Sequence, residues 1–570
     1  MTGPVNGVMH HRRFVLLVFW RAPAVAAVAV ALFVIGANTA LSSSPPTSMR
    51  AWSGSPAAAA ESCKPPTGWQ STKATPVPGI PSDYDLTSFD GTTIRIHWFP
   101  DPRGPSGRWH PTVLMGPGWG SSGDTDTSPA GIQGALSIAQ LWRGGFNVLT
   151  WDPRGFGHSG GQAEVDSPND EGRDVSAMLN WVAQQAGVQL DRPGVPRVGM
   201  VGESYGGGVQ FAAAERDCRI DAIAPTIAWH SLGTSLDKNQ TPKTGWGNIL
   251  ARVSSTAHLD PEITTADNEM DTTGTIDARA VAFFDSRGPA QFLSRVRVPT
   301  LILQGTVDDL FTLDEGIENY QALHRHRTTV SMAWFCGGHG VCLTDPGSAL
   351  EVGPLSVAWM EHYVADDASV HVLKGFAFVD QDGTSYAAPG YPLPPGPPIV
   401  ANGSGTLALQ AAGGSGPPVV AANAEAANIV DSVALPVTPG PAKSALNITV
   451  PITRAAVLVG PPTLSMTYSG TVAPGTRPTR VFAQLVDPVT RIVVNNQITP
   501  IPVTLDGKSH TVTLPLESIG YTAKAGTSLQ LQLVATTVAY ITPRLGGTIN
   551  FERVRVEVPT AKGLHILQSG

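Results

Sequence analysis

The sequence RVGMVGESYGGG, residues 197–208, constrains the fold of this chain more than any other stretch. It begins with an apolar run at 198–201 that suits a buried strand, and residues 209–216 after it suit a helix. The turn between them reads G-x-S-x-G with Ser204 at its centre. Strand, tight turn and helix in this order predict a nucleophile elbow, in which small neighbours let strand and helix approach closely. We expect the Ser204 hydroxyl to stand clear of the sheet, with the Tyr205 N–H directed at the same space.

Two later strand ends carry the acid and the base that such a serine needs. An apolar run at 299–303 leads into the sequence GTVDD, where Asp308 fits the position of an acid after a glycine turn. Its neighbour Asp309 is the alternative. Another apolar run, at 330–335, is followed by His339 between glycines. The chain order Ser, Asp, His predicts a triad in which His339 takes the serine proton and the acid orients the imidazole.

A glycine-rich loop, GPGWG at 116–120, follows the apolar strand predicted at 112–115. Glycines allow backbone N–H groups to turn toward a ligand oxygen. We expect the N–H of Trp119 to supply one half of an oxyanion hole and the N–H of Tyr205 the other half. A plain turn is the alternative for this loop.

The alternation of apolar strands and amphipathic helices predicts an α/β hydrolase fold, with a mostly parallel sheet and helices on both faces. We place this domain at 61–368, with an inserted cap at about 229–295, where the alternation ends. Residues 369–446 are expected to form a connecting segment. Short β-branched runs punctuated by Pro and Gly then predict an all-β sandwich or jelly-roll domain at 447–570.

The first 60 residues predict export from the cytoplasm. Basic residues at 10–13 precede apolar runs at 14–20 and 22–37, which is the order found in export signals. No good cleavage site follows, so an uncleaved N-terminal anchor that tethers the chain to a membrane is the alternative. Residues 41–60 are rich in Ser, Pro and Ala and suit a flexible tether. In either case the folded part would be secreted or held in the cell envelope.

The chain has four cysteines, and two of them, Cys336 and Cys342, bracket His339. In an exported protein this spacing favours a disulfide that stiffens the loop. A zinc site is the alternative, but C-x2-H-x2-C lacks a fourth local ligand and would occupy the base. Cys63 and Cys218 are candidates for a second bridge, although four cysteines allow three pairings. We expect no metal and no cofactor.

The charge of the chain argues against nucleic acid as a partner. The formal net charge is −8, and no basic stripe is present. The expected partner is a small-molecule or peptide substrate. The sequence does not indicate an oligomeric state.

These motifs resemble those of the X-prolyl dipeptidyl peptidase and cocaine-esterase-like hydrolases, a family of α/β hydrolases with a C-terminal jelly-roll domain. The resemblance covers most of residues 80–560. It is carried by GESYGG at 202–207, GTVDDLF at 305–311, GGHG at 337–340, GPPTL at 460–464 and LVDP at 485–488.

The resemblance implies a Ser204–Asp308–His339 triad, a helical cap and hydrolysis of an amide or ester. Dipeptidyl-peptidase activity is the favoured function, and carboxylesterase or acylase activity is the alternative within the same chemistry. A non-catalytic binding protein of the envelope is the alternative of another class. Well-known members use a tyrosine hydroxyl in the loop that matches 116–120, and this chain has none there. A backbone donor is therefore expected in its place.

Overall fold

The structure is a computed structural model of the chain. It describes residues 72–103, 109–128, 136–344, 350–418 and 433–567. The predicted export signal or anchor, the tether and Cys63 lie outside the described residues. Among the residues described, no helix has the length and apolar character needed to cross a bilayer.

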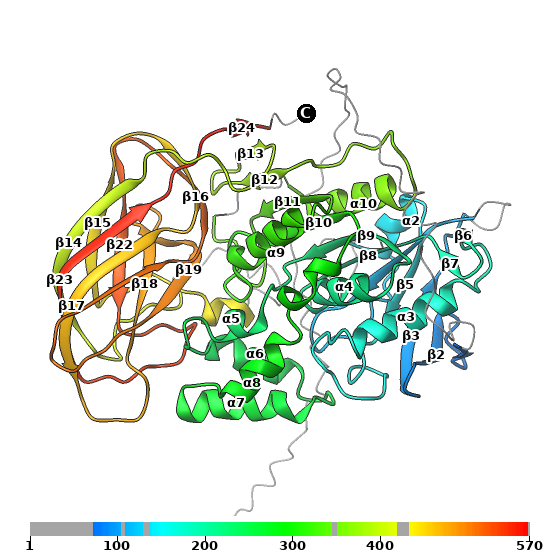
Figure 1. Cartoon of the computed structure of the whole chain (residues 1–570), viewed down its shortest axis with the longest axis horizontal. Helices are drawn as coiled ribbons and strands as arrows, with labels where there is room; N and C mark the ends of the chain where they lie inside the picture. Colours follow the sequence, from blue (N-terminus) through cyan, green and yellow to red (C-terminus); the bar gives the residue numbers. More distant parts are fainter. Residues whose placement is uncertain (1–71, 104–108, 129–135, 345–349, 419–432, 568–570) are drawn as a thin grey trace, which may run out of the picture.

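A large sheet forms the centre of the α/β part (Figure 1). Its strands lie side by side in the order β1 (Ala74–Pro76), β2 (Asp83–Thr87), β3 (Thr93–Phe99), β5 (Asn147–Trp151), β4 (Thr112–Gly116), β8 (Val198–Glu203), β9 (Ile220–Thr226), β10 (Thr300–Gly305), β11 (Val330–Phe335), β12 (Phe376–Val379), β13 (Ser385–Ala388) and β24 (His565–Ile566). The strands from β5 to β12 in this order run parallel to one another, and the flanking strands pair antiparallel. A small hairpin of β6 (Leu190–Arg192) and β7 (Val195–Pro196) lies outside this sheet.

Helices cover both faces of the parallel strands, because successive side chains of a strand point to opposite faces. Leu114 of β4 packs in the core beneath α3 (Glu171–Val182), α4 (Tyr205–Arg216) and α9 (Leu313–Arg325). Its neighbours Val113 and Met115 pack in the opposite core, beneath α2 (Ile138–Arg143) and α10 (Val352–Tyr363). The predicted α/β hydrolase fold is confirmed.

A group of helices follows β9 and precedes β10, where the sequence predicted a cap. It contains α5 (Leu232–Leu236), α6 (Thr244–Val253), α7 (Pro261–Thr273), α8 (Ala278–Asp285), and the 3-10 turns η2 (Pro289–Gln291) and η3 (Leu293–Arg295). The start of α7 is set by Asp260, whose side chain accepts from the Glu262 N–H, and its end by Gly274 with φ of 79°. Figure 1 shows α5–α8 gathered at one end of the α/β part, beside the C-terminal sheets.

The C-terminal part consists of antiparallel sheets that share one apolar core. One sheet has the order β14 (Ile399–Ala408), β23 (Gly547–Val558), β17 (Thr463–Val472) and β20 (His510–Pro515), and the other has the order β15 (Ala445–Ile452), β22 (Thr527–Val534), β18 (Arg480–Asp487) and β19 (Ile492–Pro502). β16 (Ala456–Gly460) pairs with β21 (Ile519–Ala523), and the short turn η4 (Leu435–Val437) lies before β15. The predicted all-β C-terminal part is confirmed.

Within the described residues of the stretch 369–446, predicted to be a connecting segment, three complete strands are present, and β15 begins at its end. β12 and β13 extend the main sheet, and β14 belongs to a C-terminal sheet. β12 is buried along its whole length, so its sequence shows no alternation, and β14 contains glycines at a register shift. These features explain why the strands were missed.

Candidate active site

The loop after β8 holds Ser204 in a strained conformation. Its φ of 56° and ψ of −114° lie outside the regions that residues with a Cβ ordinarily adopt. A Cβ added to Gly206 would lie 2.1 Å from the Gly116 carbonyl oxygen, so only glycine allows this contact between α4 and the end of β4. The predicted strand, turn and helix are present. The tight packing keeps the serine at the carboxyl edge of the sheet.

Three side chains from separate loops form a hydrogen-bonded chain at this edge. His339 Nε2 lies 2.9 Å from Ser204 Oγ, and His339 Nδ1 lies 2.7 Å from Asp308 Oδ2. The second oxygen of Asp308 accepts from the N–H groups of Leu310 and Phe311, at 3.0 and 2.7 Å. The serine is 4% exposed, the histidine 1% and the aspartate 0%. An imidazole placed between a carboxylate and a hydroxyl can take the hydroxyl proton and make the oxygen nucleophilic.

Aromatic rings and glycine contacts fix the imidazole. The ring of Phe311 lies edge-on to His339 with 4.9 Å between ring centroids, and the ring of Trp246 does so at 5.7 Å. A Cβ added to Gly340 would lie 1.9 Å from the Val307 carbonyl oxygen, so the histidine loop lies directly against the aspartate loop. These contacts leave the imidazole little freedom to move.

The Asp309 side chain hydrogen-bonds to Trp246 and not to the imidazole. Its Oδ1 accepts from the indole N–H of Trp246 at 2.9 Å, which links the acid loop to α6 of the cap. Burial, and then the charge of Asp308, raise the pKa of Asp309 to about 7. Of the two acids considered from the sequence, Asp308 is the one that contacts His339.

The two residues whose N–H groups are expected to bind an oxyanion line the cavity beside Ser204. Trp119 and Tyr205 line the same cavity as Ser204, and their rings pack edge-on with 5.2 Å between centroids. The indole N–H of Trp119 donates to the Leu250 carbonyl at 3.2 Å, whereas the Tyr205 hydroxyl donates to Glu171 at 3.2 Å. Neither backbone N–H donates to another residue in the described part of the chain.

The cavity beside Ser204 has a volume of about 470 Å³ and a largely apolar lining from the cap. Residues of α6 and α7, among them Ile263 and Met270, form much of its wall. Two titratable side chains from the cap segment, His258 and Asp267, also line it. The Asp267 side chain makes no hydrogen bond or ion pair with any residue that the structure describes. Burial, and then the charge of Asp271, raise the pKa of Asp267.

Comparison with known proteins supports hydrolysis by a serine activated in this way. Residues 90–340 match the family model described as X-Pro dipeptidyl-peptidase (S15 family). This region contains all three side chains of the hydrogen-bonded chain. The match covers less than half of the chain and supports a serine hydrolase. The resemblance found in the sequence is confirmed over these residues.

Solved structures share the fold of this chain. A CocE/NonD family hydrolase from Staphylococcus aureus superposes with a TM-score of 0.61 at 12% identity, covering 84% of this chain and 93% of that chain. An aminopeptidase from the marine sediment archaeon Thaumarchaeota archaeon gives a TM-score of 0.59 at 11% identity, covering 88% of this chain and 98% of that chain. At these identities the likeness is one of fold alone.

A curated relative matches a smaller part of the chain. An uncharacterized 31.7 kDa protein in the traX-finO intergenic region of Escherichia coli is 34% identical over 85 residues. The match covers 15% of this chain and 28% of the relative's length.

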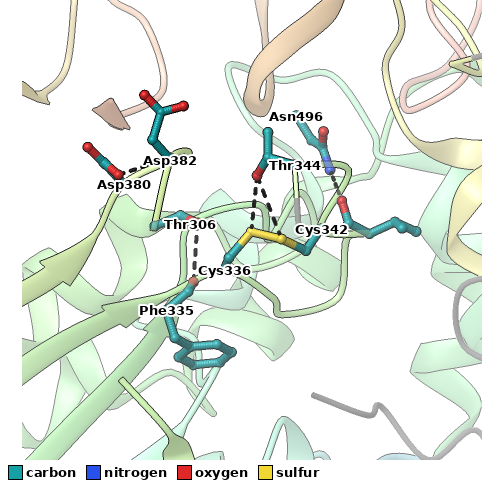
Figure 2. The surroundings of a disulfide bond; sticks show 9 residues. Thr306, Phe335, Cys336, Cys342, Thr344, Asp380, Asp382 and Asn496 are labelled. Atoms are coloured by element: carbon teal, nitrogen blue, oxygen red, sulfur yellow. Dashed lines mark hydrogen bonds between the residues drawn. A yellow bond between two sulfur atoms is a disulfide. The ribbon is translucent and has the colours of Figure 1, made fainter. Parts of the chain in front are cut away.

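A disulfide joins Cys336 and Cys342, as the sequence predicted, with 5.6 Å between the Cα atoms (Figure 2). It closes the loop that carries His339. The zinc alternative is therefore wrong for this pair, since the two sulfurs are bonded to each other and cannot ligate a metal as thiolates. Cys218 is also disulfide-bonded, and its predicted partner Cys63 lies outside the described residues.

Replacing both Cys336 and Cys342 with serine should lower the free energy of unfolding by about 2 kcal/mol, as expected from the entropy of closing a short loop. Urea denaturation of the variant and the parent protein would measure the difference. A change below about 0.5 kcal/mol would contradict the prediction.

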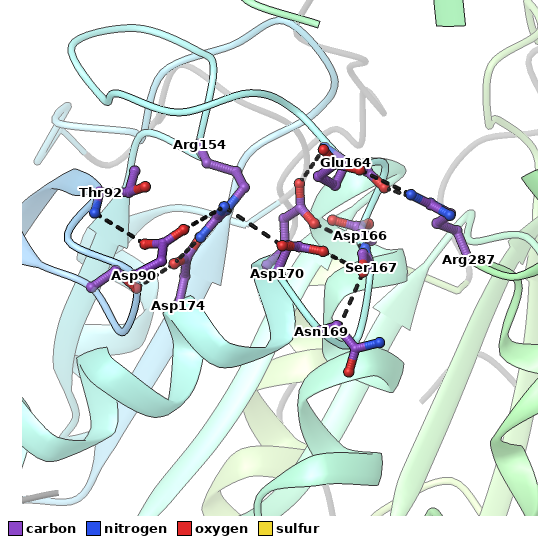
Figure 3. A network of polar contacts seen from close by, with 12 residues as sticks. Asp90, Thr92, Arg154, Glu164, Asp166, Ser167, Asn169, Asp170, Asp174 and Arg287 are labelled. Carbon is purple, nitrogen blue, oxygen red and sulfur yellow. Dashed lines mark hydrogen bonds and ion pairs between the residues drawn. The ribbon is translucent and has the colours of Figure 1, made fainter. Parts of the chain in front are cut away.

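A polar network holds the loop after β5 against α3 (Figure 3). The guanidinium of Arg154 contacts Asp174 at 2.7 Å and Asp90 at 3.2 Å. Farther along, Arg287 after α8 pairs with Glu164 at 2.9 Å, which ties the end of the cap to the segment before α3. This network is structural, because none of its members lies among the residues that line the cavity.

Proposed function

We propose that Ser204, His339 and Asp308 are a catalytic triad that cleaves an amide or ester through an acyl-enzyme. The observation that carries the proposal is the continuous hydrogen-bonded chain from the serine hydroxyl through the imidazole to the carboxylate. A protein that only binds a ligand has no need of this arrangement. A non-catalytic envelope binding protein is therefore the weaker alternative.

In the proposed mechanism, His339 Nε2 takes the proton of Ser204 while Oγ attacks the substrate carbonyl carbon. The Asp308 carboxylate keeps the imidazole in the productive tautomer and stabilises the imidazolium. The N–H groups of Trp119 and Tyr205 donate to the oxyanion, and each such donor contributes about 3–4 kcal/mol in comparable enzymes. The imidazolium then protonates the leaving group, and water hydrolyses the acyl-enzyme by the same steps in reverse order.

The substrate that we favour is a short peptide with a free amino terminus, as expected for a dipeptidyl peptidase. The argument rests on Asp267, a carboxylate in an apolar cavity wall with no partner among the described residues. An ammonium group bound there would form an ion pair with this partly buried carboxylate. The runner-up, a carboxylesterase or acylase, is supported by the apolar remainder of the wall, which suits an uncharged acyl group.

Replacing Asp267 with asparagine tests the substrate class. For an X-Pro p-nitroanilide with a free amine, kcat/KM should fall by about 10- to 100-fold, the cost of one hydrogen bond to a charged group. The N-acetylated form of the same substrate should be cleaved equally by variant and parent. Initial rates on both substrates give the comparison.

The matched control is Asp271→Asn, which removes an exposed charge one turn along α7. It should leave the free-amine preference intact. If the parent protein cleaves p-nitrophenyl acyl esters but no X-Pro anilide, the carboxylesterase hypothesis replaces the peptidase hypothesis. If a fluorophosphonate probe fails to label the parent protein at all, the hypothesis of a non-catalytic binding protein gains support.

We also propose that the folded part works outside the cytoplasm, secreted or held in the cell envelope. The disulfide between Cys336 and Cys342 supports this location, because such bonds persist in oxidising compartments. The basic and apolar order of the first 37 residues supports it independently.

A further inference from the structure

Strand β19 of the C-terminal part leaves its regular register at one place. In the neighbouring strand β18, Gln484 pairs with Ile498 of β19, and Val486 pairs with Val493 of β19. Residues 494–497 of β19 therefore bulge out opposite a single residue of β18. Within this bulge Asn495 and Asn496 have φ of 53° and 55°. Two consecutive left-handed residues that are not glycine are costly, and such strain persists only where surrounding contacts enforce it.

The bulge directs two buried amides at the loops that carry the acid and the base. Gln497 Nε2 donates to the backbone carbonyl of Asp308 at 2.8 Å. Asn496 Nδ2 donates to the backbone carbonyl of Val341 at 2.9 Å, two residues beyond His339 (Figure 2). The glutamine is 4% exposed and the asparagine 1%. The loops that carry Asp308 and His339 are thus each held by one side chain from the C-terminal part.

These two amides act where the loops touch each other. A Cβ on Gly340 would lie 1.9 Å from the Val307 carbonyl oxygen and 3.3 Å from Asn496 Nδ2. The acid loop, the base loop and the bulge therefore meet at one point. A shift of either loop there would change the distance between Asp308 and His339 directly.

We propose that Asn496 and Gln497, two side chains of the C-terminal part, are positioning residues for the reaction. They hold the acid and base loops at the distance that lets Asp308 contact His339. This inference rests on the proposed triad. A misplacement of about 1 Å can cost about 100-fold in rate. In metal sites, loss of a hydrogen bond that orients a ligand typically costs about 10- to 100-fold, and we expect a loss of similar size here. Neither residue lines the cavity, so substrate binding should be spared. The expected signature is a fall in kcat with an unchanged KM.

The test replaces Gln497 with methionine, which keeps the length of the side chain and removes its donor. The matched control is Gln484→Met. Gln484 is 1% exposed, lies in the same sheet, and donates to the Gly440 carbonyl at 3.0 Å, away from the catalytic loops. We expect Gln497→Met to lower kcat by at least about tenfold with KM within about twofold of the parent. Gln484→Met should keep kcat, even if both variants lose similar thermal stability.

A second variant covers the case in which Gln497→Met does not fold. Asn496→Gly removes the amide and accepts the positive φ without strain, so it should fold and still lose about tenfold in kcat. If kcat of the folded variants stays within about twofold of the Gln484→Met control, the inference is wrong.

Ser204→Ala separates the two proposals. If that variant is inactive while the bulge variants are fully active, the inference alone fails, whereas a fully active Ser204→Ala removes the proposed triad itself.

Discussion

Ser204→Ala should lower kcat/KM by about 10⁶-fold, the loss seen when the nucleophile of a triad is removed. The reason is that no acyl-enzyme can form without Oγ, while the cavity and the oxyanion donors remain. Only the smaller acceleration that binding and these donors give to direct attack by water should survive. Initial rates on a p-nitrophenyl acyl ester and on an X-Pro p-nitroanilide measure the loss. Labelling by a fluorophosphonate probe should disappear with it.

A matched serine in the same cavity provides the control. Ser255 also lines the cavity and is exposed, but no imidazole hydrogen bond to it is present among the described residues. Ser255→Ala should retain activity within about twofold and should still be labelled, because only an activated hydroxyl reacts. Undiminished turnover by Ser204→Ala would show that another group performs the reaction.

The local sequence determines the elbow almost completely. Gly202, Ser204 and Gly206 stand in a pattern whose steric reason, the close approach of α4 to β4, can be stated from the residue types alone. The positions of Asp308 and His339 after later strands follow from the same rule, since parallel strands bring their carboxyl ends to one edge of a sheet. The confirmed fold and the contact between these side chains were therefore predictable.

Contacts between distant segments were not predictable in this way. Asp267 lies on α7 among other polar residues, and only the folded cap shows that it lines the cavity. Asn496 and Gln497 lie in β19, where a strand pattern gives no sign of a bulge or of a partner more than 150 residues away. The sequence analysis accordingly treated the C-terminal part as a packing domain. The consecutive polar residues 495–497 within a β-branched strand were the one available signal.

The second large loss of activity is expected when the acid of the proposed triad is replaced. Asp308→Asn should lower kcat by about 10⁴-fold, because an amide can donate to His339 Nδ1 and so favour the tautomer that cannot accept the serine proton. Its oxygen can still accept from the N–H groups of Leu310 and Phe311, so the loop should keep its shape. Steady-state kinetics on the better of the two substrates above, together with a thermal unfolding curve, would measure both effects.

The neighbouring acid supplies the matched comparison. Asp309→Asn should lower kcat by no more than about tenfold, because the amide oxygen can accept from the Trp246 indole as the carboxylate does. The pKa of about 7 means that this carboxyl is already partly neutral near neutral pH, so a neutral amide is a close substitute. The reverse order, with Asp309→Asn nearly inactive and Asp308→Asn active, would contradict the assignment. A rearranged acid loop would then have to bring Asp309 to the imidazole, against the hydrogen bonds that hold Asp308 in that place.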